Sequence, residues 1–169
     1  MLKKNLIIIL VLVLLSSCKS DAKNNKNENL ERVFNYKNLS FNIPVSFKKD
    51  TLISNRWINK NTGVTLNIEV EYSETELEQY VKDAIKTIKR VYPNYEIIEK
   101  LALTKKVSSL LARAVVQNMK LKFYMLIISL EKSKVIITIG GRENVLKEDS
   151  YKTFIDLIKI KDGKNESCK

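Results

Sequence analysis

Residues 121–139 read LKFYMLIISLEKSKVIITI, two apolar runs joined by a short polar segment. The run over 123–130 is almost entirely apolar, which is typical of a strand that is covered on both faces. A polar turn around Ser133 leads into a second apolar strand over 135–139. We therefore expect the strand over 123–130 to lie at the centre of a sheet that has a layer on each face, with the strand over 135–139 following it after the turn.

Apolar and polar residues alternate over 64–71, which predicts a strand with one buried and one polar face. Gly63 ends the turn before this strand and suits a positive φ angle. Trp57, on the other side of that turn, is expected to be an anchor in the core or at its rim. Further strands are expected over 34–43, 56–58, 95–103 and 110–119.

Two segments show apolar residues at helical spacing. The first spans 77–91, where Ser73 or Thr75 can start a capping box and proline ends the pattern. The second is expected over 146–160. Hairpins without regular βαβ alternation predict an α+β domain, an antiparallel sheet flanked by helices.

Residues 36–160 resemble the PsbP-like group and, within it, the bacterial DcrB-like lipoproteins. The resemblance implies an α/β/α sandwich and a role in binding macromolecules, and it carries over no catalytic residue. Fold likeness does not identify a partner. The features that carry the resemblance are Tyr36-x-x-Leu39-x-Phe41-x-Ile43-Pro44, the hairpin through Trp57, Tyr92-Pro93-Asn94-Tyr95-Glu96-Ile97-Ile98, Leu111-Ala112-Arg113-Ala114 with Tyr124, and a C-terminal helix around Phe154.

The N-terminus has the pattern of an export signal. Two lysines precede ten apolar residues, 6–15, and small residues then lead to Cys18. Ten residues rise roughly 15 Å as a helix, about half of a hydrocarbon core, so the run is too short to be a transmembrane helix. An ordinary secretory signal with an incidental cysteine is the remaining alternative.

The sequence Leu15-Ser16-Ser17-Cys18 resembles the lipobox of bacterial lipoproteins. The resemblance implies that a lipid such as palmitate is attached to the Cys18 thiol and that signal peptidase II cuts between Ser17 and Cys18. The protein would then be exported and held at the cell membrane or the outer membrane, on the periplasmic or surface side.

Four segments are expected along the chain. They are a signal peptide at 1–17, a lipidated N-terminus and flexible tether at 18–31, the α+β domain at 32–161 and a polar tail at 162–169. If the Cys18 sulfur carries lipid, Cys168 has no partner within the chain. We therefore expect no intrachain disulfide.

The chain is strongly basic, with 30 Lys and Arg against 19 Asp and Glu and a net charge of +11. Such a balance favours anionic partners such as a membrane surface, whereas nucleic acid is not expected for an exported protein. Lys82, Lys86, Lys89 and Arg90 form a basic stripe on the first predicted helix. The stripe is a candidate surface for an anion or a partner, and a solvated helix face is the plainer interpretation.

Catalytic chemistry has few candidates, because the chain contains no histidine. This excludes Ser-His-Asp and Cys-His catalysis and removes the commonest metal ligand. Two carboxylate pairs remain, Glu69 with Glu71 and Glu96 with Glu99, but an exposed polar face is the plainer interpretation, because nothing in the sequence shows the burial or partner that tunes a catalytic carboxylate. We expect no catalytic site, no metal and no cofactor apart from the covalent lipid.

Two functions are consistent with these features. The first is a lipid-anchored, non-enzymatic accessory module that binds an envelope protein through a sheet edge, loops or the basic helix face. The alternative is a carrier or sensor of a small ligand or lipid, held in a pocket between sheet and helix. A large enclosed cavity would favour the alternative.

Overall fold

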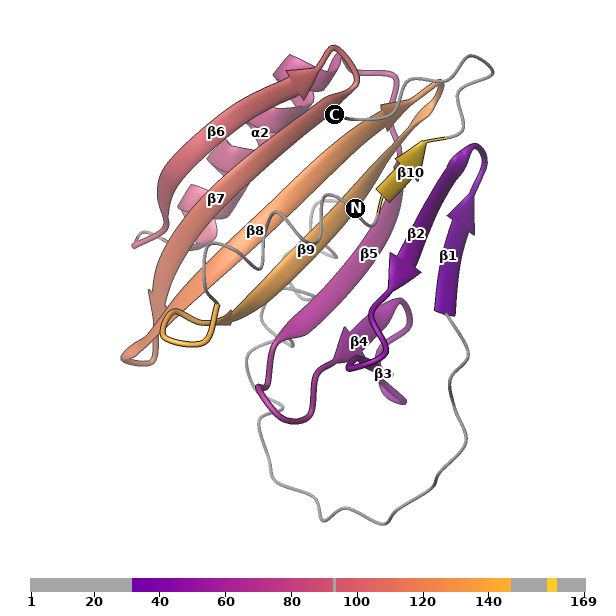
Figure 1. The fold of residues 1–169 in the computed structure, drawn as a ribbon. Helices are drawn as coiled ribbons and strands as arrows, with labels where there is room; N and C mark the ends of the chain where they lie inside the picture. Colours follow the sequence, from indigo (N-terminus) through magenta and orange to yellow (C-terminus); the bar gives the residue numbers. More distant parts are fainter. Residues whose placement is uncertain (1–31, 93, 147–157, 161–169) are drawn as a thin grey trace.

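The structure is a computed structural model that describes residues 32–92, 94–146 and 158–160. In these residues the strands form two antiparallel sheets, and a helix packs on the larger one (Figure 1). The sequence-based prediction of an antiparallel sheet with helical cover is therefore confirmed at this level.

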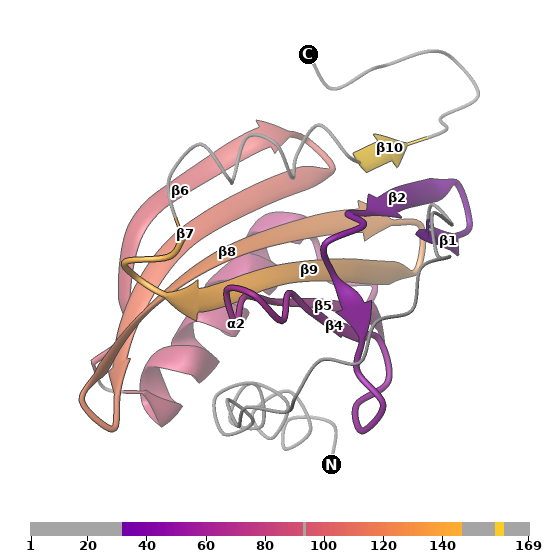
Figure 2. The ribbon, with the colours of Figure 1, turned by 60° about the horizontal axis from the view of Figure 1, so that its bottom comes forward.

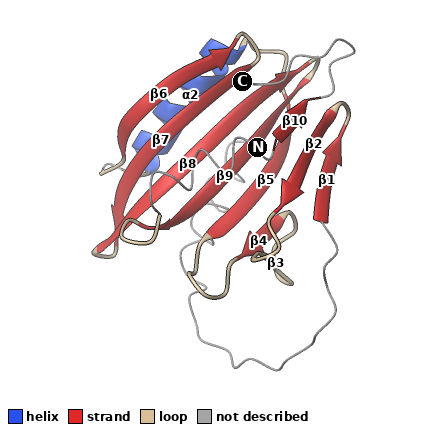
Figure 3. Ribbon diagram, in the orientation of Figure 1, coloured by secondary structure: helices blue, strands red, loops and turns tan. Residues whose placement is uncertain are grey.

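Among the described residues, the larger sheet has seven strands and the smaller has three. Figure 3 colours the strands of both sheets red. The helix α2 spans Leu77–Val91. The larger sheet consists, in order across it, of β3 (Lys48–Lys49), β4 (Arg56–Ile58), β5 (Thr65–Tyr72), β9 (Ser133–Arg142), β8 (Met119–Leu130), β7 (Val107–Val116) and β6 (Glu96–Thr104). The smaller sheet consists of β1 (Arg32–Tyr36), β2 (Leu39–Ile43) and β10 (Ile158–Ile160).

The strands β8 and β9 form a hairpin in the middle of the larger sheet, and the central position of β8 was predicted from its apolar sequence. Tyr124 pairs with Ile139, and Ile127 pairs with Ile136. Because side chains alternate along a strand, these two pairs lie on opposite faces of the sheet. All four of these side chains are buried. The hairpin is therefore covered on both faces.

The helix α2 covers one of these faces. Leu77, Val81 and Ile88 belong to the same buried cluster as Phe123 and Ile127 of β8. Figure 2 shows α2 on one side of the larger sheet and the smaller sheet on the other. The amphipathic pattern of this segment is thus explained by its packing.

The start of the helix differs from the prediction. The N-cap residue is Glu76, and no side chain caps it. The Ser73 hydroxyl instead accepts a hydrogen bond from the Thr75 N–H at 3.4 Å. The predicted capping boxes at Ser73 and Thr75 are therefore wrong. Both residues lie in the segment between the end of β5 at Tyr72 and the N-cap at Glu76, so neither is at the N-cap position.

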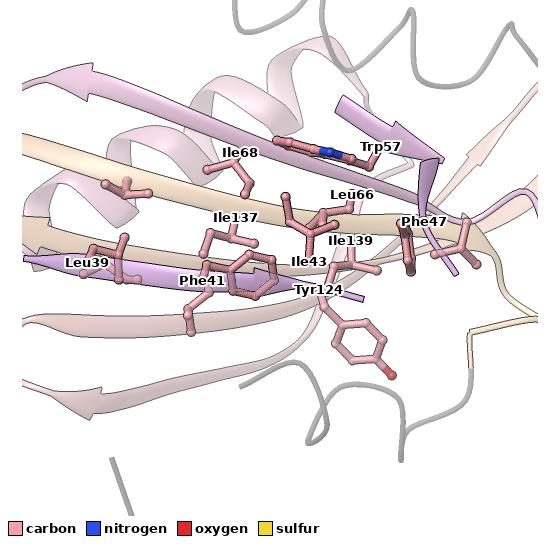
Figure 4. Packing of buried hydrophobic residues seen from close by; sticks show 14 of the residues in the cluster. Leu39, Phe41, Ile43, Phe47, Trp57, Leu66, Ile68, Tyr124, Ile137 and Ile139 are labelled. Carbon is pink, nitrogen blue, oxygen red and sulfur yellow. The ribbon is translucent and has the colours of Figure 1, made fainter. Parts of the chain in front are cut away.

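The second face of the larger sheet is covered by β2, a strand rather than a helix. Phe41 is fully buried and belongs to one cluster with Leu66 of β5 and Ile137 of β9. Figure 4 shows the β2 side chains, Ile43 among them, beside these residues of the larger sheet. The described residues thus form a helix, a central sheet and a smaller sheet, and this differs from the expected α/β/α sandwich.

The predicted C-terminal helix is wrong at its end. Ile158–Ile160 forms β10, which pairs with β2 through Ile158 and Phe41. Helical spacing included Ile158 in the pattern, but β2 presents an edge that β10 extends. The rest of that prediction, residues 147–157, lies outside the described residues.

The hairpin of β7 and β8 also differs in its bounds. Its turn is formed by Gln117 and Asn118, whose φ angles are 48° and 63°. Two consecutive positive φ angles suit a two-residue hairpin turn. The strand β7 starts three residues earlier than predicted, because the buried polar residues Ser108 and Ser109 continue the ladder.

The packing of β2 can be tested with Phe41→Ala. A buried phenylalanine replaced by alanine typically costs about 3–5 kcal/mol, so we expect the free energy of unfolding in urea to fall by that amount. Leu52→Ala is the control, since Leu52 is 85% exposed and its change should stay within about 0.5 kcal/mol. A loss below about 1 kcal/mol for Phe41→Ala would contradict the packing of the two sheets.

Candidate functional site

A polar strip runs along the α2 side of β5. Thr65, Asn67, Glu69 and Glu71 share this side because side chains alternate along a strand. Thr65 and Asn67 are only 4% exposed, whereas Glu69 and Glu71 are half-buried. The predicted single buried face is therefore wrong for the first half of β5, where the central position of the strand covers both faces.

Glu71 is bound by α2 and lies beside a lysine of β9. The Tyr80 hydroxyl of α2 donates a hydrogen bond to Glu71 Oε2 at 2.5 Å. Lys134 lies opposite Glu71 in β9, and its Nζ donates to the Ser73 carbonyl at 3.0 Å. The same Nζ lies 5.9 Å from the centre of the Tyr80 ring. The strand β9 and the start of α2 thus converge on this carboxylate.

Burial changes the acidity of the groups around Glu71. It raises the pKa of Tyr80, and the hydrogen bond to Glu71 raises it further. Burial also lowers the pKa of Lys134, partly against the attraction of Glu76. Both shifts come first from loss of water, so this end of the polar strip is partly dry.

Glu69 has the most altered carboxyl group. Burial, and then repulsion by Glu71, raises its pKa from 4.5 to about 7. A carboxyl with such a pKa changes its charge near neutral pH and can bind or release a proton there. Glu69 and Glu71 are the carboxylate pair predicted from the sequence, and the structure does bring them onto one partly buried surface.

Asn67 continues the strip toward the core. Its Oδ1 is buried and has no hydrogen-bond partner among the described residues. Arg56, its neighbour in β4, is 1% exposed and forms an ion pair with Asp50. Burial raises the pKa of Asp50, but the hydrogen bonds from Leu52 and Arg56 outweigh it and lower the pKa overall.

The second predicted carboxylate pair lies on β6. Glu96 and Glu99 face the same way, because an irregularity between Ile97 and Glu99 shifts the register. Both are exposed, and Glu96 Oε2 accepts a hydrogen bond from Arg113 at 2.6 Å. This contact lowers the pKa of Glu96. The pair therefore lacks the burial that raises the pKa of an acid catalyst.

The predicted basic stripe is exposed on α2, since Lys82, Lys86, Lys89 and Arg90 all face solvent. Lys82 forms an ion pair with Glu78 at 2.9 Å. The other three have no ion pair in the part of the chain that the structure describes. Lys89 and Arg90 lie in the last turn, where cations also stabilise the helix dipole.

An open depression of about 500 Å³ lies where β8 begins and β9 ends, at the end of these strands away from Glu69. Lys120, Arg142 and Glu143 contribute charged groups to it, together with Met119 and Asn144. It is formed by strand ends and the following turn, not by the space between sheet and helix that the carrier hypothesis needs. That hypothesis stays a prediction.

The described residues contain neither a membrane-spanning helix nor a metal-binding cluster. No helix within 32–92, 94–146 and 158–160 has the length and apolar character that crossing a membrane requires. In the same ranges, no group of three or more Asp, Glu, Cys or His residues is arranged to hold a metal ion.

The remaining predicted residues fall elsewhere. Ser17, Cys18 and Cys168 lie outside the described residues. The sequence analysis missed Lys134 and Tyr80 as neighbours of Glu71, placing one in a turn and the other on a core-facing helix. The register of β5 with β9 would have revealed Lys134, since opposite charges often face each other across strands.

Comparisons with known proteins support the fold. No protein-family model matches the chain, and no curated protein sequence matches it. The solution structure of cyanobacterial PsbP (CyanoP) from Synechocystis sp. PCC 6803 is similar, with a TM-score of 0.56 and 8% identity. The alignment covers 83% of this chain and 98% of that one. A PsbP-like fold is therefore supported, and at this identity the likeness concerns the fold alone.

A second solved structure has a lower score. It is the crystal structure of PA94 from Pseudomonas aeruginosa, a protein of unknown function. The TM-score is 0.49 and the identity 12%, over 72% of this chain and 91% of that one.

The raised pKa of Glu69 predicts a stability change with pH. Between pH 4.5 and about 7 the folded state keeps a proton that the unfolded state has released, so stability falls as pH rises through this window. Glu69→Gln removes this loss. We expect the variant to gain about 1–2 kcal/mol over the unmodified chain between pH 4 and pH 8, below the full value because Glu69 is partly exposed.

The measurement is urea unfolding of both chains at several pH values. Glu99→Gln is the matched control, because it makes the same change at an exposed position of β6. Because Glu99 is exposed, its change should alter the free energy of unfolding by no more than about 0.5 kcal/mol. A pH-independent difference for Glu69→Gln would show that Glu69 titrates normally.

Proposed function

We propose that the chain is a lipid-anchored, non-enzymatic binding module of the cell envelope. The observation that carries the proposal is Leu15-Ser16-Ser17-Cys18 directly after a short apolar run. Lipid on Cys18 would hold the protein at the cell membrane or the outer membrane. Removal of the export signal before Cys18 would make this residue the first of the mature protein.

The distance between anchor and domain supports this arrangement. The domain as described starts at Arg32, so residues 18–31 separate it from the proposed lipid. A flexible chain of that length spans roughly 20 Å on average. The domain would therefore stay close to one membrane and meet partners there.

Binding fits the chemistry of the described residues better than catalysis. The chain has no histidine, and the exposed charges on α2 are mainly basic toward its end. Among the described residues, Glu69 is the carboxyl with a pKa near neutral, and the depression that we find lies at the opposite end of the strands. A basic helix surface suits an anionic partner or lipid headgroups. The second helix was predicted over 146–160. Its part at 147–157, which would complete an α/β/α sandwich, belongs to this proposal too.

The anchor can be tested by labelling with an alkyne fatty acid in the native host. We expect the unmodified chain to be labelled and Cys18→Ala to be unlabelled, because the thiol that forms the lipid bond is gone. Cys168→Ala is the matched control and should label like the unmodified chain. Continued labelling of Cys18→Ala would exclude lipidation at this residue.

The same strains test the binding role. After crosslinking of intact cells, the unmodified chain and Cys168→Ala should yield the same envelope protein reproducibly, and Cys18→Ala should yield much less of it. If no reproducible partner were found with the labelled chain, the binding function would be contradicted while the anchor remained.

A further inference from the structure

The outer edge of β5 is only partly paired. β4 pairs with Thr65, Leu66 and Asn67, and it lies beside the lower end of β5 in Figure 3. Beyond β4, the Ile68 N–H donates to the Asn55 carbonyl at 2.9 Å. The other side of β5 is paired with β9 along its whole length, without a bulge.

The direction of the free backbone groups follows from this pattern. In an antiparallel sheet, the N–H and C=O of alternate residues point to the same edge. Since the Ile68 N–H points to the outer edge, the backbone N–H and C=O groups of Val70 and Tyr72 point there too. The backbone groups of Glu69 and Glu71 point toward β9. Within the described residues, Val70 and Tyr72 have no hydrogen-bond partner for these outward backbone groups.

The side chains at this edge are accessible. Val70 is 38% exposed and Tyr72 is 70% exposed. Both lie on the face covered by the smaller sheet. The Tyr36 hydroxyl of β1 donates a hydrogen bond at 3.4 Å to Ser133 of β9, the residue that pairs with Tyr72, so an aromatic side chain lies at the same end of the sheet. The edge therefore combines free backbone groups with apolar side chains.

The opposite edge of the larger sheet is constructed differently. β6 has two register irregularities, between Ile97 and Glu99 and between Ala102 and Thr104. Bulges of this kind hinder the addition of another strand. On the β5 side of the sheet, the edge strand is β3, which is two residues long and consists of lysines. The C-terminal end of β5, at Val70–Tyr72, has neither a bulge nor a lysine strand beside it.

We propose that the Val70–Tyr72 edge of β5 binds an extended segment of a partner protein, one with alternating basic and apolar residues, as an added strand. Backbone groups of Val70 and Tyr72 would pair with the segment. Its basic side chains would lie opposite Glu69 and Glu71 on the α2 side, and its apolar side chains would pack beside Val70 and Tyr72. This inference rests on the proposed binding function and names the docking surface and partner chemistry.

A second copy of the chain fits this edge poorly. Antiparallel pairing of two such edges about Val70 would place Glu69 of each copy opposite Glu71 of the other. Like charges directly opposite destabilise a strand pair. A basic segment removes this repulsion and supplies opposite charges.

The test is amide hydrogen exchange of the full chain, labelled with ¹⁵N in detergent micelles. In the free protein we expect fast exchange at Val70 and Tyr72 and slow exchange at Glu69 and Glu71, which are bonded to β9. The probe is a short blocked peptide in which valine and lysine alternate. Its addition should slow exchange at Val70 and Tyr72 by about tenfold or more.

Val70→Lys places a charge on the edge and should abolish this protection. Leu103→Lys is the matched control, because Leu103 is 39% exposed at the other edge and should leave the protection intact. Slow exchange at Glu69 and Glu71 confirms that each variant is folded. A peptide with glutamate in place of lysine tests the charge requirement on the unmodified chain and should not protect the edge.

Several outcomes would overturn the proposal. These are slow exchange at Val70 and Tyr72 in the free monomer, protection at another surface only, or equal protection by the acidic peptide. Protection that appears with protein concentration alone would assign the edge to a second copy. Labelling at Cys18 is independent of all of these results, so failure here would leave the anchor intact.

Discussion

The rest of the structure depends on the burial of the β8–β9 hairpin on both faces. Such a hairpin is stable only between two layers, since each fully buried apolar side chain contributes about 1.5–3 kcal/mol. The helix α2 supplies one layer and β2 the other. Gly140 shows how closely the hairpin packs, because a Cβ at this position would lie 2.9 Å from the ring of Phe123.

The same constraint explains the properties of β5. This strand pairs with β9 on one side, but β4 covers only its first residues on the other. Burial therefore decreases along the strand, from Asn67 at 4% exposure to Tyr72 at 70%. Glu69 lies at this boundary, where water is partly excluded and Glu71 is near, and its pKa rises for both reasons. The shortness of β4 thus accounts both for the partial burial that raises the pKa of Glu69 and for backbone groups of Val70 and Tyr72 that have no partner among the described residues.

Local periodicity predicted much of the fold. The hairpin, β5 and the body of α2 are where the apolar spacing placed them. The prediction failed where neighbours decide: β10 is a strand because β2 presents an edge to it. In the candidate site, Glu69 and Glu71 were predicted to share a face, but their burial was not. Tyr80, which binds Glu71, and Lys134, which lies opposite it in β9, were missed because they belong to other elements of the fold.

By itself, the sequence determined most of the strands and the helix α2, and its lack of histidine excludes histidine chemistry. It also predicts the export signal on which the proposed lipid at Cys18 depends. These properties are local, since each depends on residue type and spacing within a short segment. Only the tertiary structure decided which strand lies at an edge, which layer covers each face and which carboxyl loses water. Those properties depend on long-range strand pairing, and the same alternating sequence serves a central strand or an edge strand equally well.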